Sequence, residues 1–89
     1  MIRTSVTITN KLGLHARASA KLTKLAGSFN CEVHLSKAGR RINAKSIMGV
    51  MMLAAGAGSE LELEVDGADE EPACQALVAL IDDKFGEGQ

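Results

Sequence analysis

Aromatic residues are almost absent from this chain of 89 residues, which has two phenylalanines and neither tryptophan nor tyrosine. Its hydrophobic core must therefore be aliphatic, built from Val, Leu, Ile, Met and Ala. No apolar run approaches the roughly 20 residues that a membrane-spanning helix needs. The first residues also lack the apolar segment of a signal peptide. We therefore expect a cytoplasmic protein that folds as one domain over residues 1–89.

Net charge and cysteine content are also low. The net charge is −1, which argues against a general nucleic-acid binder, because such domains are strongly basic. Cys31 and Cys74 have neither the spacing of metal ligands nor the density of a disulfide framework. We expect two reduced thiols, no metal site and no cofactor.

Apolar periodicity is the strongest signal that the sequence does contain. Alternation predicts strands at residues 2–9, at 31–36, over a short stretch through Ile42, and at 60–65. Helical spacing predicts helices at residues 16–26, at 47–53, and from about 70 to 85. The expected order is βαββαβα, an α+β open-faced β-sandwich whose helices cover one face of the sheet. Polar alternate residues, His34 among them, should leave the other face in solvent.

The same periodicity predicts which helical residues enter the core and where the helices end. Gly27 and Gly86 should stop the first and last helices, and Asp69 should cap the last one. Residues 87–89 should then fray. The expected core positions of these two helices are Ala18, Leu22, Leu25, Ala26, Phe29, Ala73, Leu77, Leu80, Ile81 and Phe85.

The junction between the first strand and the first helix breaks two local rules. His15 stands where Ser, Thr, Asp or Asn normally caps a helix. Arg17 puts a cation in the first turn, where the helix macrodipole disfavours it. Breaks of this kind, without a structural gain, tend to mark functional sites. The helix end also offers backbone N–H groups to an anion and disfavours the imidazolium, which predicts a neutral ring with a free lone pair.

A neutral imidazole can act as a nucleophile. If His15 attacked phosphorus, the phosphoryl group would lie among the backbone amides of Ala16 and Arg17 and beside the Arg17 guanidinium. The plain alternative is a loop histidine next to a solvated arginine. A small enzyme that uses His15 as general base is less favoured, because the sequence places no second titrating group near it.

A second motif follows the third predicted strand. Ser46 has the right chemistry for an N-cap, and Val50 and Leu53 are the expected core residues of the short helix. The apolar residues Ile47, Met48 and Met51 would then be exposed on the other face. Methionine suits an adaptable docking surface, because its unbranched side chain repacks against varied partners. The alternative is a short helix that is buried on all sides.

Together, Gly13-Leu14-His15-Ala16-Arg17 and Lys45-Ser46-Ile47-Met48-Gly49-Val50-Met51 resemble the HPr family of histidine-containing phosphocarriers. This family serves the bacterial phosphoenolpyruvate-dependent phosphotransferase system. The resemblance runs from Val6 to about Phe85 and implies an antiparallel sheet of strand order 1-4-2-3. It implies that His15 takes a phosphoryl group on Nδ1 from Enzyme I and passes it to Enzyme IIA-type proteins, for sugar uptake and regulation. The chain would be a carrier and not an independent enzyme, and we expect a monomer.

The resemblance also gives roles to the second motif. Ile47, Met48 and Met51 would dock donor and acceptor, and Ser46 would be phosphorylated in some bacteria by an HPr serine kinase/phosphorylase. A cap alone also explains Ser46. One departure is Ala18, where the family usually has proline. The alternatives to this leading interpretation are a nitrogen-branch regulatory phosphocarrier and a small α+β interaction domain without phosphotransfer.

Overall fold

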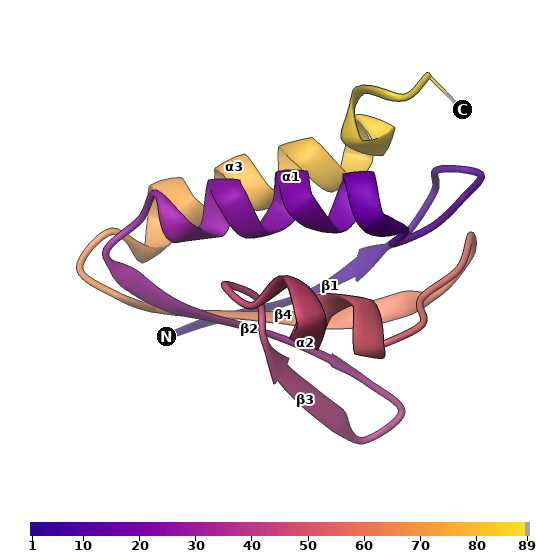
Figure 1. Cartoon of the computed structure of the whole chain (residues 1–89). Coiled ribbons are helices and arrows are strands. Elements are labelled where there is room, and N and C mark those ends of the chain that lie inside the picture. The colour runs from indigo at the N-terminus through magenta and orange to yellow at the C-terminus, as the bar shows by residue number, and fades with distance from the viewer. Residues whose placement is uncertain (89) are drawn as a thin grey trace.

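Alternating apolar residues build a single four-stranded sheet in the computed structural model, which describes residues 1–88 (Figure 1). The strands hydrogen-bond in the order β1-β4-β2-β3, and every pair is antiparallel. This confirms the strand order that the family resemblance implied. The strands are β1 (Ile2–Thr7), β2 (Cys31–Lys37), β3 (Arg40–Asn43) and β4 (Glu60–Gly67).

Three α-helices cover one face of this sheet, as the sequence predicts (Figure 1). They are α1 (Ala16–Gly27), α2 (Ile47–Met52) and α3 (Glu70–Asp82), followed by the short 3-10 helix η1 (Lys84–Gly86). The α+β open-faced sandwich is therefore confirmed. The core between the layers is aliphatic apart from Phe85, which is fully buried, and Phe29, which is half-buried. Within residues 1–88, no helix is long and apolar enough to cross a membrane.

The end of α3 differs from the prediction. The helix stops at Asp82, and Lys84 and Phe85 adopt left-handed backbone angles with φ of 53° and 55°. These angles end the α-helical path, and the Phe85 ring enters the core from η1 and not from α3. Leu80 is only partly buried, as are Leu25 in α1 and Phe29 in the loop after it.

Two predicted helix ends are also wrong in detail. Gly27 is the last residue of α1 and not the residue after it, and Ser28 follows in a right-handed conformation. Asp69 precedes α3, but its side chain makes no cap. Its Oδ2 accepts from the backbone N–H of Asn30 at 2.7 Å, because the loop before β2 lies against it. Glu70 Oε1 accepts from the backbone N–H of Gly67 at 3.2 Å.

One residue on the outer face of the sheet is less solvated than predicted. Glu64 is only 7% exposed, because arginines from both sides cover its carboxylate. Arg41 Nε donates to Oε1 at 3.1 Å, and Arg3 Nη2 donates to Oε2 at 3.4 Å. The hydrogen bond from Arg41 is the main cause that lowers the pKa of the Glu64 carboxyl. His34, the cross-strand partner of Glu64, is half-buried.

Candidate functional site

The loop between β1 and α1 is held by contacts that the sequence did not predict. Asn10 is fully buried, and its Nδ2 donates to the carbonyl oxygen of Gly13 at 2.8 Å. Leu14 N donates to Ala55 O at 2.8 Å, which joins this loop to the loop after α2. Gly13 has φ +66°, and a Cβ there would lie 2.4 Å from Ala55 O, so only glycine fits. Gly13 and Leu14, which lead into His15 and α1, are therefore held in place by Asn10 and by the loop after α2.

His15 occupies the N-cap position of α1, as predicted. Its backbone is extended and its carbonyl accepts from Ser19 N at 2.8 Å, so it begins the helix. Its side chain makes no capping hydrogen bond, and the first turn contains no acidic residue. The helix starts at Ala16 although Ala18 stands where the family usually has proline. The N-terminal end of α1 thus keeps uncapped backbone N–H groups beside an imidazole.

Glu87 is the functional neighbour that sequence reasoning missed. Its Oε2 lies 2.5 Å from His15 Nε2, and its Oε1 accepts from Asn10 Nδ2 at 3.0 Å. The expectation that this residue frays is wrong, as is the expectation that no titrating group lies near His15; Gln89 lies outside the described residues. The two partners are 72 residues apart, so no local pattern could have paired them.

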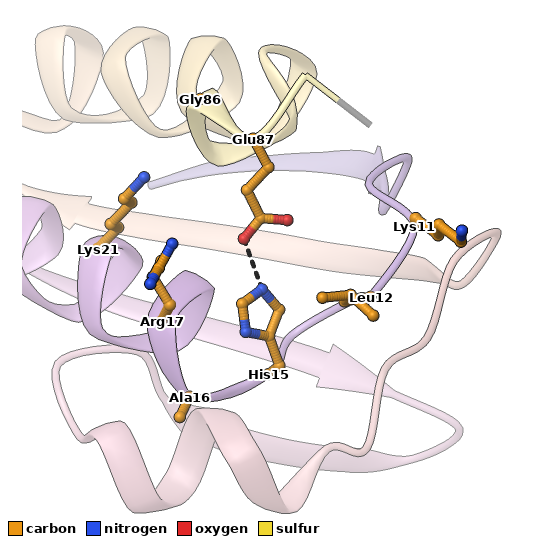
Figure 2. A pocket seen from close by; sticks show the side chains of 8 residues that line it. All are labelled: Lys11, Leu12, His15, Ala16, Arg17, Lys21, Gly86 and Glu87. Atoms are coloured by element: carbon orange, nitrogen blue, oxygen red, sulfur yellow. Dashed lines mark hydrogen bonds and ion pairs between the residues drawn. The ribbon is translucent and has the colours of Figure 1, made fainter.

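The environment of the Glu87 carboxyl keeps it ionised. Its side chain is 15% exposed, and this burial alone would raise the pKa of the carboxyl. The hydrogen bonds from Asn10 and His15, and then the charges of His15 and Lys21, outweigh burial, so that the pKa of Glu87 is lowered. The group that faces His15 Nε2 is therefore a carboxylate. The other ring nitrogen faces the beginning of α1 (Figure 2).

His15 and Glu87 border an open pocket of about 810 Å³. Three cations also line it, namely Lys11, Arg17 and Lys21, and Figure 2 shows Arg17 on the same side as the free ring nitrogen of His15. Arg17 is exposed, and within residues 1–88 its side chain makes no ion pair. The pocket can accept an anion that reaches His15, Ala16 and Arg17 together. The three residues predicted to form one site thus lie together.

The second predicted motif lies beside the first. Helix α2 contacts α1 and lies next to its beginning (Figures 1 and 2). Ser46 Oγ accepts from the backbone N–H of Gly49 at 3.2 Å, which confirms the predicted cap. Val50 and Leu53 are buried, and the other face is exposed, so the alternative of a helix buried on all sides is wrong. The exposed apolar residues are Ile47 (39%), Met48 (68%), Met51 (41%) and also Met52 (58%).

Residues 1–88 contain no group of three or more His, Cys, Asp or Glu side chains that could hold a metal ion. Cys31 and Cys74 are both free, and burial raises the pKa of each thiol.

Comparisons with known proteins identify the family of this chain. Residues 2–83 match the family model described as the PTS HPr component phosphorylation site. The chain is 63% identical to the phosphocarrier protein HPr of Cupriavidus necator and 56% identical to that of Neisseria meningitidis, in both cases over the full length of both chains. The crystal structure of HPr-C-His from Thermoanaerobacter tengcongensis superposes with a TM-score of 0.95. That alignment has 44% identity and covers 98% of each chain.

Proposed function

The chain belongs to the HPr family and is a phosphocarrier of the phosphotransferase system, and from this premise we propose that His15 accepts the phosphoryl group on Nδ1. The observation that carries the proposal is the position of His15. It stands at an uncapped helix N-terminus, with one ring nitrogen engaged by Glu87 and the other facing that helix end (Figure 2).

In the proposed step, the Nδ1 lone pair attacks the phosphorus of the donor. An N–P bond forms while the bond between phosphorus and the donor breaks, so the phosphoryl group moves and nothing is oxidised or reduced. Its oxygens are then placed to accept from the backbone N–H groups of Ala16 and Arg17 and from the Arg17 guanidinium. Hydrogen bonds between a cation and an anion are roughly twice as strong as neutral ones.

We propose Enzyme I as the donor and Enzyme IIA-type proteins as acceptors. The exposed residues Ile47, Met48 and Met51 belong to α2, which contacts α1, and they form the proposed docking face. Unbranched methionine side chains can repack against more than one partner, which a carrier needs because it meets a donor and an acceptor in turn. Sugar uptake and its regulation would follow from the acceptor used.

Phosphotransfer from Enzyme I tests this proposal, with Arg17→Ala as the diagnostic variant. With labelled phosphoenolpyruvate, wild type should be labelled and should pass the label to an Enzyme IIA protein. Arg17→Ala should be labelled about 10- to 100-fold more slowly, because a charged hydrogen bond to the phosphoryl group is lost. Its melting temperature should not fall, since a cation in the first turn of a helix is unfavourable by about 0.3–1 kcal/mol.

The matched control is Lys24→Ala, because Lys24 lies in the last turn of α1 and does not line the pocket. It should be labelled as fast as wild type. An Arg17→Ala protein with normal labelling and a large loss of melting temperature would make Arg17 a structural residue. No labelling of wild type would contradict the proposed role of His15.

Ser46 gives a second test, in which stability and activity separate. Its Oγ caps α2 through Gly49 N, so Ser46→Ala should lower the free energy of unfolding by about 0.5–2 kcal/mol. Ser46→Asp keeps a capping oxygen and suits the macrodipole, so it should be at least as stable as the alanine variant. It should nevertheless accept phosphate from Enzyme I more slowly. We propose that the donor presents acidic groups to the cations that line the pocket, and the added negative charge would repel those groups.

Paired melting curves and phosphotransfer rates of wild type and both variants at low salt measure these effects. Slow transfer by a stable aspartate variant would support regulation through phosphorylation of Ser46 by an HPr serine kinase/phosphorylase, since phosphate adds a similar negative charge. If the aspartate variant accepts phosphate as fast as wild type, Ser46 is only a helix cap.

A further inference from the structure

We propose that Glu87 is a positioning residue of the phosphorylation site, whose carboxylate holds the ring hydrogen of His15 on Nε2 and leaves the lone pair on Nδ1. The inference rests on the proposed function of His15. It adds a residue from the opposite end of the chain to a site that otherwise consists of residues 15–17.

The direction of the hydrogen bond follows from the chemistry of the two groups. An ionised carboxylate has no hydrogen to give, so His15 Nε2 must donate across the 2.5 Å contact to Glu87 Oε2. A neutral imidazole carries one N–H and one lone pair, so the lone pair is then on Nδ1. Asn10 Nδ2 donates to the second carboxylate oxygen at 3.0 Å and fixes its rotation. The lowered pKa of Glu87 supports the ionised form.

Glu87 is held in place and does not meet His15 by chance. The Phe85 ring is fully buried and anchors the segment two residues before Glu87. Lys21 Nζ donates to Phe85 O at 2.6 Å, and Glu87 N donates to Lys84 O at 3.0 Å. Asn10, the other partner of Glu87, is itself fully buried. Contacts from α1 and within η1 therefore hold the segment that carries Glu87, and the loop before α1 holds its carboxylate through Asn10.

The same contact suits both directions of phosphoryl transfer. When Nδ1 attacks phosphorus, the ring gains a positive charge while the hydrogen stays on Nε2, and the facing carboxylate stabilises that charge. When the N–P bond breaks, its electron pair returns to Nδ1 and leaves a neutral ring, so no proton has to move. Among the residues that line the pocket, Glu87 is the one anion, and Lys11, Arg17 and Lys21 are cations. The carboxylate faces Nε2, whereas Nδ1, where the phosphoryl group is proposed to arrive, faces the beginning of α1 (Figure 2).

Nuclear magnetic resonance of protein labelled with ¹⁵N-histidine tests the contact without any phosphotransfer. Wild type should show an Nε2–H proton of His15 at low field and protected from exchange with water, as expected for a short hydrogen bond to a carboxylate. In Glu87→Ala this signal should move upfield or disappear by exchange. Glu60→Ala removes an exposed carboxylate outside the pocket and should leave the signal unchanged. An unchanged His15 signal in Glu87→Ala would overturn the proposal.

Transfer kinetics from Enzyme I separate a positioning role from a docking role. Glu87→Ala should lower kcat by about 10- to 100-fold, because a charged hydrogen bond to the reacting ring is lost. Its KM for Enzyme I should stay unchanged, because the docking face on α2 is intact. Glu87→Gln, which keeps an acceptor oxygen without the charge, should fall between wild type and Glu87→Ala. An unchanged kcat would overturn the proposal, as would a change confined to KM.

The two measurements fail in different ways. If the Nε2–H signal depends on Glu87 but Enzyme I labels neither wild type nor variant, the proposed function of His15 is wrong and the contact stands. If Enzyme I labels wild type and Glu87→Ala equally, the proposed function stands and the positioning role is wrong.

Discussion

Substituting His15 by alanine is expected to abolish phosphorylation by Enzyme I and to leave the fold intact. The His15 side chain is 28% exposed, makes no cap, and contacts Glu87 at the rim of the pocket and not in the core. The substitution creates no core cavity, and loss of the hydrogen bond to Glu87 should lower the free energy of unfolding by about 1–3 kcal/mol, which leaves the domain folded. Labelling with radioactive phosphoenolpyruvate and Enzyme I measures the first effect, and a melting curve measures the second.

The matched control is His34→Ala, because His34 is the other histidine of the chain and lies on β2, away from the pocket. It should be labelled like wild type. The bond formed on wild type should be a phosphoramidate, lost in mild acid and retained in base. Full labelling of His15→Ala would contradict the assignment, and an acid-stable product would point to a hydroxyl acceptor.

Much of the fold could be predicted because its signals are local. In β4, Leu61, Leu63 and Val65 alternate with glutamates, and the structure buries all three. Burial of Glu64 could not be predicted in the same way, because Arg3 and Arg41 reach it from two other strands. The pairing of β1 with β4 is also non-local, and only the family resemblance supplied the strand order.

The structural setting of the candidate site was predicted as far as it is local. His15 and Arg17 stood out because each breaks a rule about the first turn of its own helix. Asn10 and Glu87 break no local rule, so nothing in their surroundings in the sequence marked them. The turn at Lys84 and Phe85 was hidden for another reason: two left-handed residues that are not glycine carry no sequence signal. That turn is what brings Glu87 back to the site.

The electrostatic prediction for His15 was incomplete for the same reason. The macrodipole of α1 disfavours a cation at its N-terminus. This was the only electrostatic influence on His15 that could be predicted from the sequence. The structure adds a carboxylate on the opposite side of the ring. The two influences act on different nitrogens: the helix end faces Nδ1, and Glu87 holds the hydrogen on Nε2 (Figure 2). The sequence therefore indicated the surroundings of one ring nitrogen, and the fold supplies the partner of the other.

The largest expected loss of stability comes from Phe85→Ala. The ring is fully buried, and it is the one aromatic residue at the centre of an aliphatic core. Removing a buried phenylalanine ring costs about 3–5 kcal/mol, from lost burial and the cavity left behind. In a domain of this size each kcal/mol lowers the melting temperature by about 4–8 °C. Thermal and urea unfolding should therefore show a fall of more than about 10 °C and a lower denaturation midpoint.

Phe85→Leu separates the packing of the ring from the backbone turn. Leucine keeps an apolar side chain at the same left-handed position, so it should lose clearly less stability than alanine, although both have the same backbone strain. Because the buried ring anchors the segment that carries Glu87, Phe85→Ala should also weaken the Nε2–H signal of His15 in the folded protein, and Phe85→Leu should largely keep it. If Phe85→Ala costs less than about 1 kcal/mol and leaves that signal intact, the ring does not anchor the segment, and the contacts of Lys21 and Asn10 must hold Glu87 on their own.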